Sequence, residues 1–405
     1  MKILYMHQYF ATRDSSTGTR SYEFARILKE RGHEVEVLTG DSQLGALTEH
    51  QTKRFGTYEV DGITVHAIRN RYENNFSKWR RIWAFLQFLF LACFFQVKHR
   101  KYDIIFATST PLTIGIPALF LSWKSKTPFV FEVRDLWPEA PYQLGYIQSR
   151  FIYRILCYFE SLIYKQATHI VALSPGMKNG VIAHGVTEKK ISVIPNSADI
   201  ELFDVASTGE IRLHFQLQDK FILAHVGSMG VINGLDYLIE SARILDEQGR
   251  EDIVILLTGD GGKRVELENM VASYGLKNVI FTGKIPKKDI PTLMADVDAT
   301  IMSVKHHPIL EMASPNKFFD SLAAGKPTLV NCEGWMKDMV EEYQSGLFVR
   351  PTKPSDIVQA VDALKLDVEN NFGKNAYRLA IEHFDRRKLA QKLEHVLKEA
   401  MKARG

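Results

Sequence analysis

Residues 221–234 read Phe-Ile-Leu-Ala-His-Val-Gly-Ser-Met-Gly-Val-Ile-Asn-Gly, an apolar run of strand length followed by a loop of small residues. Residues 235–248 have helical periodicity, so this stretch predicts a strand, a tight loop and a helix in sequence. The first half of the chain opens in the same way, because an apolar run at 2–7 precedes small residues at 15–20 and a helical pattern at 21–31. A strand, a small-residue loop and a helix form the first unit of a ligand-binding parallel sheet. The sequence therefore predicts two such sheets.

Short apolar runs alternate with longer amphipathic segments along most of the chain, which is the pattern of parallel sheets whose crossovers are helices. The strands expected in the first half are 2–7, 34–39, 63–68, 103–107, 129–133, 169–172 and 191–194. Those expected in the second half are 221–226, 253–258, 279–282, 299–303, 327–331 and 347–349. The predicted fold class is α/β, with two Rossmann-like parallel-sheet domains.

The strand pattern also divides the chain. We expect an N-terminal domain at 1–197, a hinge at 198–218, where strand signals stop, and a C-terminal domain at 219–366. Residues 367–405 have helical patterns and no strand, and whether they cross back to the first domain stays open.

The composition is that of a folded globular protein, with 45% apolar and 24% charged residues in a chain of 405. Three cysteines are too few for a disulfide framework or a four-ligand zinc site, and the first seven residues have too short an apolar run for a signal peptide. We therefore expect a cytoplasmic protein without a bound metal ion or cofactor. Residues 1–200 hold 25 Lys and Arg against 17 Asp and Glu, but no helix carries a basic stripe. An anionic membrane surface is favoured over nucleic acid as the partner of this half.

Residues 313–327, Ala-Ser-Pro-Asn-Lys-Phe-Phe-Asp-Ser-Leu-Ala-Ala-Gly-Lys-Pro, combine a helix start with a cation and a carboxylate one turn apart. A helix that begins at Ser314 and Pro315 has Lys317 and Asp320 on one face. Such a pair can hold a diphosphate and ribose hydroxyl groups, and its alternative is an ordinary ion pair on the helix surface. The glycine-rich loop at 259–264 lacks the spacing of a Walker loop and is predicted to be a turn.

The segment from Asp320 to Pro327 resembles the nucleotide-sugar motif of retaining family-4 glycosyltransferases, which have the two-domain GT-B fold. Segments 31–35, 193–199 and 234–238 agree with that family in order, and residues 7–10, 18–23 and 134–139 resemble bacterial O-antigen or capsule transferases, notably L-fucosamine (N-acetyl-L-fucosamine) transferases. The resemblance implies two domains facing across a cleft. It also implies transfer of a sugar, with retention, from a UDP-sugar to a polyprenyl-diphosphate-linked saccharide at the inner face of the cell membrane. The alternatives are a GT-B nucleotide-sugar epimerase and a non-catalytic nucleotide-sugar-binding scaffold.

The chain departs from the family pattern at several positions. Asp320 stands where the family has a second glutamate, and the first falls on Met312, with Glu311 one residue away. Ser228 and Asn233 replace an Arg and a Lys, so the charge of the diphosphate is expected to fall on Lys317 and loop backbone. The predicted donor-binding residues are Gly18, Gly227, Ser228, Asn233, Gly283, Lys284, Ile285, Ser314, Asn316, Lys317 and Asp320.

Residues of the first half are expected to bind the acceptor and to provide the catalytic side chains. His7, Arg20 and Arg134 are predicted to bind the acceptor. Asp135 follows the strand at 129–133, where its carboxylate can orient an acceptor hydroxyl or stabilise charge at the anomeric carbon, and its alternative role is to cap the turn. Glu139 is a second catalytic candidate.

The segment from Ile82 to Val97 has only two clearly polar side chains, Gln87 and Gln96, and basic residues on both sides. Its 16 residues would span about 24 Å as a helix, short of the roughly 30 Å of a bilayer core. We favour a helix at about 79–98 embedded in one leaflet, over a buried helix or one at a dimer interface. The residues predicted to contact lipid are Trp83, Phe85, Phe88, Leu89, Phe94 and Phe95.

Overall fold

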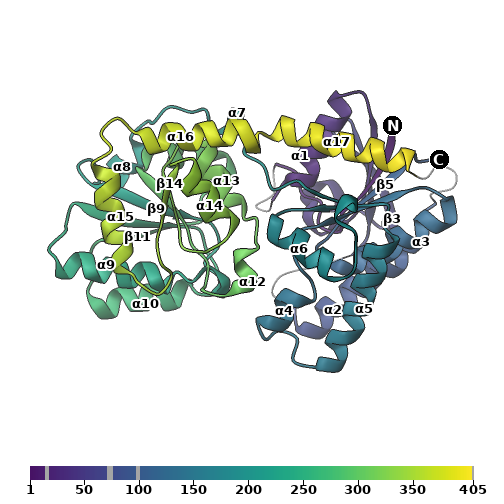
Figure 1. Cartoon of the computed structure of the whole chain (residues 1–405), viewed down its shortest axis with the longest axis horizontal. Helices are drawn as coiled ribbons and strands as arrows, with labels where there is room; N and C mark the ends of the chain where they lie inside the picture. The colour runs from purple at the N-terminus through teal and green to yellow at the C-terminus, as the bar shows by residue number, and fades with distance from the viewer. Residues whose placement is uncertain (14–17, 71–75, 97–100, 404–405) are drawn as a thin grey trace. The chain divides into compact units, whose positions relative to one another are not determined.

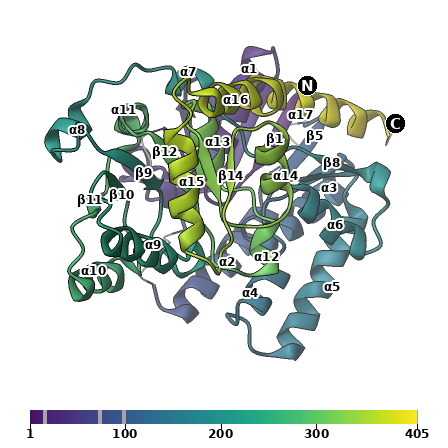
Figure 2. The ribbon, with the colours of Figure 1, turned by 60° about the vertical axis from the view of Figure 1, so that its left-hand side comes forward.

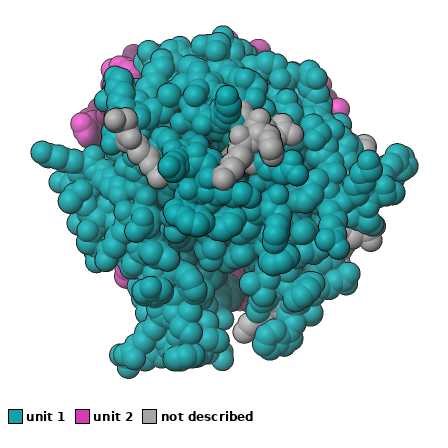
Figure 3. Space-filling view, turned by 90° about the vertical axis from the view of Figure 1, so that its right-hand side faces the viewer, with its two compact units in different colours: residues 1–195, 387–405 teal, residues 196–386 magenta. Residues whose placement is uncertain are grey.

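The computed structural model describes the whole chain except residues 14–17, 71–75, 97–100 and 404–405, together with the side chains of 46, 78 and 81. The chain forms two compact units (Figures 1 and 3). Unit 1 comprises Met1–Pro195 and Arg387–Gly405, and unit 2 comprises Asn196–Arg386. The segment 198–218, predicted as a hinge, belongs to unit 2, and the C-terminal helix belongs to unit 1.

Unit 1 is built on an eight-stranded sheet in the order β3-β4-β2-β1-β5-β6-β7-β8. Its strands are β1 Lys2–Met6, β2 Glu34–Gly40, β3 Phe55–Val60, β4 Ile63–Ile68, β5 Ile104–Thr108, β6 Phe129–Val133, β7 His169–Ala172 and β8 Ile191–Val193. All neighbours are parallel except β3 and β4, which form an antiparallel hairpin at one edge.

The helices of unit 1 are α1 Arg20–Glu30, α2 Lys78–Cys93, α3 Gly115–Ser125, α4 Glu139–Gln143, α5 Arg150–Gln166, α6 Pro175–Ala183 and α17 Arg386–Lys402. The last of these follows unit 2 in sequence but packs with α1 in one core with β1, β2 and β5. Its apolar residues at 389, 393, 396, 397 and 400 recur at helical spacing and are buried. Buried Glu394 accepts hydrogen bonds from Arg31 and from His33, the latter at 2.8 Å, so the segment after α1 holds α17 in place.

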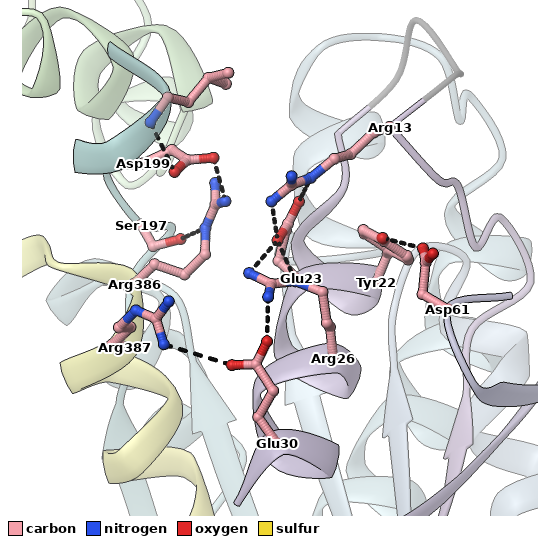
Figure 4. A network of polar contacts seen from close by, with 11 residues as sticks. Arg13, Tyr22, Glu23, Arg26, Glu30, Asp61, Ser197, Asp199, Arg386 and Arg387 are labelled. Carbon is pink, nitrogen blue, oxygen red and sulfur yellow. Dashed lines mark hydrogen bonds and ion pairs between the residues drawn. The ribbon is translucent and has the colours of Figure 1, made fainter. Parts of the chain in front are cut away.

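Figure 4 shows the contacts of Arg386 and Arg387, the two residues between which the chain passes from unit 2 back to unit 1. Within unit 2, Arg386 binds Asp199 and Ser197, and within unit 1, Arg387 lies 3.4 Å from Glu30. Each unit therefore anchors its own side of the junction.

Unit 2 has a six-stranded parallel sheet in the order β11-β10-β9-β12-β13-β14. Its strands are β9 Phe221–Val226, β10 Ile253–Thr258, β11 Val279–Gly283, β12 Ala299–Met302, β13 Thr328–Val330 and β14 Gly346–Phe348. Its helices are α7 Ile200–Phe203, α8 Glu210–His214, α9 Asp236–Glu247, α10 Arg264–Tyr274, α11 Ile290–Asp296, α12 Pro308–Glu311, α13 Asn316–Ala323, α14 Trp335–Glu342, α15 Ser355–Lys365 and α16 Asn371–Leu379 (Figure 2). The core joins α9, α15 and the inner residues of β9 and β10.

The prediction of an α/β chain with two Rossmann-like parallel sheets is confirmed. The predicted strands match the observed ones to within one residue or so at each end, while β3 was not predicted. No helix within the described residues is long and apolar enough to cross a membrane.

Candidate active site

The small-residue loop after β9 meets the start of α13 at the carboxyl end of the unit 2 sheet. Lys317 Nζ donates hydrogen bonds to Asn233 Oδ1 at 2.8 Å and to the Ser303 carbonyl at 2.7 Å. Asn233 Nδ2 in turn donates to Ser228 Oγ at 3.2 Å. The structure thus brings together Ser228, Asn233 and Lys317, three of the predicted donor-binding residues, and Gly227 lies beside the Lys317 stem.

Lys317 and Asp320 line one small cavity in unit 2, together with Val226, Ile290 and Ser321. Burial lowers the pKa of Lys317 to about 7. Burial also raises the pKa of Asp320 to about 6, against the opposing fields of Lys287 and Arg386. The hydrogen bonds of Lys317 Nζ go to Asn233 and Ser303 and not to Asp320, so the structure does not show the alternative of an ion pair on the helix surface. Lys317 and Asp320 therefore lie on the same side of α13, next to one small cavity.

The start of α13 is fixed from both sides. Ser314 is buried, and its Oγ accepts a hydrogen bond from the Asn196 backbone N–H at 3.2 Å while its carbonyl accepts one from Asn196 Nδ2 at 2.5 Å. Phe318 and Phe319 face the core and pack against Trp335. Because the opposite face is buried, the helix orientation places Lys317 and Asp320 toward the cavity, while Asn316 is exposed.

The glycine-rich loop after β10 packs directly on the loop after β9, a role that the sequence analysis missed. A Cβ on Gly259 would lie 1.9 Å from the Gly227 carbonyl oxygen, and one on Gly261 would lie 2.6 Å from the Met229 carbonyl oxygen. Both glycines also have positive φ, so other residues would be strained there. In the sequence these positions are marked only by the run of glycines at 259–262. That run does not indicate which other loop the glycines contact.

The remaining predicted donor residues lie at the next strand end or outside unit 2. The Gly283 carbonyl at the end of β11 accepts from the Gly259 N–H at 2.9 Å, and Ile285 follows in the same loop. The Lys284 side chain is 81% exposed and lies 3.5 Å from Asp260, so it is no part of the Lys317 cluster. Gly18 lies in unit 1, just before α1, and Ser15, Ser16 and Thr17 of the small-residue loop at 15–20 lie outside the described residues.

Asp135 stands at the carboxyl end of the unit 1 sheet, directly after β6. Its Oδ2 accepts a hydrogen bond from Thr110 Oγ1 at 2.9 Å, and its side chain is exposed. The Arg134 backbone N–H donates to Ser109 Oγ at 2.9 Å, and the Arg134 guanidinium lies 3.4 Å from His7 Nε2. Burial and then the Arg134 charge hold the pKa of His7 well below its ordinary value, so this imidazole is neutral. His7 therefore follows β1, and Arg134 and Asp135 follow β6, at the same edge of the sheet with β5 between the two strands.

Gln8 is a site candidate that the sequence analysis did not single out. It follows His7, is 1% exposed, and neither its amide nitrogen nor its amide oxygen has a hydrogen-bond partner among the described residues. The Nδ1 atom of His7 is also buried and has no hydrogen-bond partner among the described residues. Buried amides are rarely left unsatisfied, so these groups are candidates for a polar ligand.

The prediction that Arg20 binds the acceptor needs correction. Its side chain is 2% exposed and forms an ion pair at 2.8 Å with Glu132, which is fully buried. Its other N–H groups donate to the carbonyls of Ile194 and Pro195, so the guanidinium is committed to joining α1 to β6 and to the end of β8. Arg20, the first residue of α1, therefore has a structural role in a buried ion pair.

Glu139 also has structural partners. Its carboxylate accepts a hydrogen bond from Tyr153 of α5, which joins α4 to α5, and one at 2.5 Å from Gln143 within α4. Asp135 and Glu139 therefore have different surroundings, and only Asp135 is exposed at the strand end.

The predicted membrane helix is α2, which ends at Cys93, and it is embedded in the unit on one side. Phe88 and Phe95 are 1% and 6% exposed, so both belong to the core and cannot contact lipid. Phe85 and Leu89 are half-buried, and Phe85 packs edge-on against Tyr9. Trp83 and Phe94 are 67% and 59% exposed. The reason for the error is that a helix without a polar face can still bury one apolar stripe under its own fold.

Within the described parts of the chain, no group of three or more His, Cys, Asp and Glu side chains could hold a metal ion. The cluster around Lys317 offers hydrogen-bond donors suited to an anion instead.

Comparisons with known proteins cover both units. Residues 16–197 match the glycosyl transferase 4-like domain, and residues 210–379 match glycosyl transferases group 1. The chain is 24% identical over 400 residues to an uncharacterized glycosyltransferase, MJ1607, of Methanocaldococcus jannaschii, covering 94% of this chain and 93% of that protein. It is 22% identical over 346 residues to WcaI of Escherichia coli (strain K12), a provisional colanic acid biosynthesis glycosyl transferase. This match covers 83% of this chain and 84% of that protein. Among solved structures, Anabaena Alr3699/HepE in complex with UDP and glucose has the same fold, with a TM-score of 0.73 at 20% identity over 98% of this chain and 100% of that one.

Proposed function

Because the chain belongs to the group 1 glycosyltransferases with the GT-B fold, we propose that it moves a sugar from a nucleotide diphosphate donor to a polyprenyl-diphosphate-linked saccharide, with retention. The donor is a UDP-sugar in this proposal, in line with the UDP and glucose bound by Anabaena HepE. The sugar is an N-acetylated amino or deoxy sugar, with N-acetyl-L-fucosamine as the first candidate from the sequence resemblance. The setting is bacterial O-antigen or capsule assembly at the inner face of the cell membrane.

The observation that carries this proposal is the pair of Lys317 and Asp320 on one cavity. Lys317 is held by Asn233 and Ser303 in a position ready for a diphosphate, and it supplies the charge that Ser228 and Asn233 lack. The Asp320 carboxylate has no hydrogen-bond partner among the described residues, so it is available to the hydroxyl groups of a ribose. The family's first glutamate is replaced by Met312, and Glu311 lies at the end of α12.

Asp135 is the catalytic residue of this proposal. In a front-side displacement the acceptor oxygen forms a bond to the anomeric carbon on the face from which the diphosphate leaves. The leaving phosphate oxygen takes the acceptor proton, so no protein nucleophile is needed. The Asp135 carboxylate then orients the acceptor hydroxyl or stabilises positive charge at the anomeric carbon. His7, Gln8 and Arg134 contribute acceptor contacts.

The test is incubation with a panel of radiolabelled nucleotide sugars and a lipid-linked acceptor. Label transferred to the lipid, with the anomeric configuration of the donor retained, supports the proposal. An isomerised free donor would indicate an epimerase instead, and binding without turnover would indicate a scaffold. Both results would overturn it.

We expect replacement of Lys317 by Ala to weaken donor binding by about 10- to 150-fold, because a hydrogen bond to a charged group contributes about 1.5 to 3 kcal/mol. Asp320→Ala should also weaken binding, through the ribose. Calorimetry with the donor measures both effects. Lys326→Ala is the matched control, because Lys326 donates to the Ala295 carbonyl and does not line the cavity. Equal affinity in all three folded variants would remove Lys317 and Asp320 from the donor site.

We also expect donor affinity to be greatest near pH 6 to 7. The pKa of Lys317 is about 7, so above that pH the free lysine is neutral and must take up a proton when it binds the diphosphate. Affinity should then fall by up to about tenfold per pH unit. Below about pH 6 Asp320 becomes protonated, and its hydrogen bonds to hydroxyl groups weaken. Calorimetry in buffers of different ionisation enthalpy should detect proton uptake at pH 8, and Lys317→Ala should abolish it. A flat profile in the unchanged protein would contradict this assignment.

A further inference from the structure

Three neighbouring helices of unit 1 each carry apolar side chains that are exposed in the described part of the chain. On α2, the exposed residues Trp79, Trp83, Leu86 and Phe90 recur at spacings of three and four, and Phe94 directly after the helix continues the same stripe. The buried residues Ala84, Phe88 and Ala92 form the opposite stripe. Helix α2 is therefore apolar on both sides, and only one side is needed for the core.

The next two helices repeat this arrangement. On α3, Phe120 is 40% and Trp123 is 73% exposed. On α5, Phe151, Ile155 and Tyr158 are 74%, 40% and 66% exposed, while the opposite side buries Glu160 and Tyr164. Soluble proteins rarely expose apolar side chains on three adjacent helices without a binding function.

The sheet topology puts these helices on one face. Helix α2 connects β4 to β5, α3 connects β5 to β6, and α5 lies between β6 and β7. All three connections run in the same direction along the strand order, and right-handed crossovers then lie on the same face of the sheet. Helix α1 connects β1 to β2 in the opposite direction. Helix α3 packs against both α2 and α5, so the three outward stripes are adjacent.

The positive charge on these three helices favours an anionic partner. They contain seven Lys and Arg and a single carboxylate, that of Glu160. Glu160 is 1% exposed and lies 3.0 Å from His184, so it contributes no negative charge to the outer surface. Arg80, Arg150 and Arg154 are exposed beside the aromatic rings. Two copies of this surface would bring like charges together, whereas an anionic lipid surface would complement them.

We propose that the outward stripes of α2, α3 and α5 form one composite surface that docks on an anionic phospholipid bilayer. The three exposed Trp rings, Trp79, Trp83 and Trp123, suit the boundary between headgroups and acyl chains, where amphipathic aromatic side chains gather. The surface lies on the bilayer, and the buried stripe keeps the helices attached to the sheet. This inference deepens the proposed function, since it rests on a lipid-linked acceptor for its purpose, but its test requires no sugar transfer.

Vesicle flotation of the full chain tests the docking surface. The protein should float with vesicles of phosphatidylcholine and phosphatidylglycerol and bind more weakly to phosphatidylcholine alone. The variant Trp83→Ser/Trp123→Ser/Phe151→Ser should lower the partition coefficient by about tenfold or more, because it removes one exposed ring from each helix. The matched control is Leu213→Ser/Val265→Ser/Leu366→Ser, which removes side chains of similar exposure from unit 2 and should bind like the unchanged protein.

A charge series gives a second, independent measurement. Replacing Arg80, Lys124 and Arg154 with Gln should weaken binding to the anionic vesicles by about fivefold for each residue, and added salt should remove the difference. Replacing Lys189, Lys277 and Lys392, which lie elsewhere, should have little effect. These variants leave the core unchanged, so they remain informative if the ring variants are unstable.

The outcomes separate this inference from the proposed function. Flotation without sugar transfer would support the surface and contradict the transferase. Sugar transfer without flotation would support the transferase and overturn the docking surface. A dimer in sedimentation experiments that the ring variant converts to monomers, with no binding to either vesicle, would assign the surface to a second copy of the chain and overturn the lipid proposal.

Discussion

Replacement of Asp135 by Asn is expected to lower turnover by about 10²-fold or more while donor affinity stays within a few-fold. Asn has the same shape and can still accept the hydrogen bond from Thr110 Oγ1, which is 2.9 Å long in the unchanged protein. The variant therefore removes only the negative charge, and groups that act on a proton or a developing charge typically contribute 10²- to 10⁴-fold, which is about 3 to 5 kcal/mol. The measurement is kcat with saturating donor, with donor affinity followed by calorimetry.

Glu139→Gln is the matched control for this prediction. Its carboxylate accepts hydrogen bonds from Tyr153 and Gln143, so the substitution should affect the packing of α4 on α5 more than turnover. Near-normal turnover in Asp135→Asn would reduce Asp135 to a turn residue. A large loss in Glu139→Gln alone would transfer the catalytic role to Glu139.

Replacement of Arg20 by Met is expected to lower the free energy of unfolding by about 3 to 5 kcal/mol. The ion pair that it removes is buried on both sides, since the Arg20 and Glu132 side chains are 2% and 0% exposed. Removing the cation leaves the Glu132 charge buried without its partner, which is the costly way to break such a pair. Thr108 still donates to Glu132 at 2.6 Å, but a hydroxyl cannot replace the charge. Urea unfolding followed by circular dichroism measures the change.

Two controls distinguish a buried pair from a general effect of losing an arginine. Arg26→Met removes a partly exposed arginine that pairs with Glu30 on the same helix and lies 3.4 Å from Glu23. Because Glu23 keeps its ion pair with Arg13 at 2.7 Å, this change should cost less than about 1 kcal/mol. The double variant Arg20→Met/Glu132→Leu should recover much of the lost stability, because no buried charge remains. Unchanged stability in Arg20→Met, with an increased KM for the acceptor, would restore the acceptor-binding role.

Most of the fold could be predicted because buried parallel strands are continuous apolar runs separated by helices. The exception is β3, Phe55–Val60, whose alternation of half-buried and exposed residues resembles a loop in composition. Its signal was the Asp61-Gly62 pair, where both residues have positive φ and form a tight hairpin turn. An edge strand with one exposed face lacks the apolar run on which the other predictions depended.

The site could be predicted where function depends on position along a strand or helix. Lys317 follows from helix spacing, while Ser228 and Asn233 follow from the family resemblance of the loop after the strand at 221–226, and the structure joins the three through hydrogen bonds. Arg20 could not be assigned in this way, because its partner Glu132 is 112 residues away and an arginine at a helix start looks the same whether it is buried or exposed. The roles of Gly259 and Gly261 were hidden for a similar reason, since the backbone that they approach belongs to another loop.

The return of α17 to unit 1 has a consequence for the order in which the protein folds during synthesis. Leu389, Leu393 and Leu397 belong to the core of unit 1, so the first 195 residues lack part of their own core when they leave the ribosome. Unit 2 is a single continuous segment and is complete as soon as Arg386 has emerged. The second unit to be translated can therefore reach its native state before the first. A nascent chain arrested before α17 has emerged should leave residues 1–195 more sensitive to protease than residues 196–386.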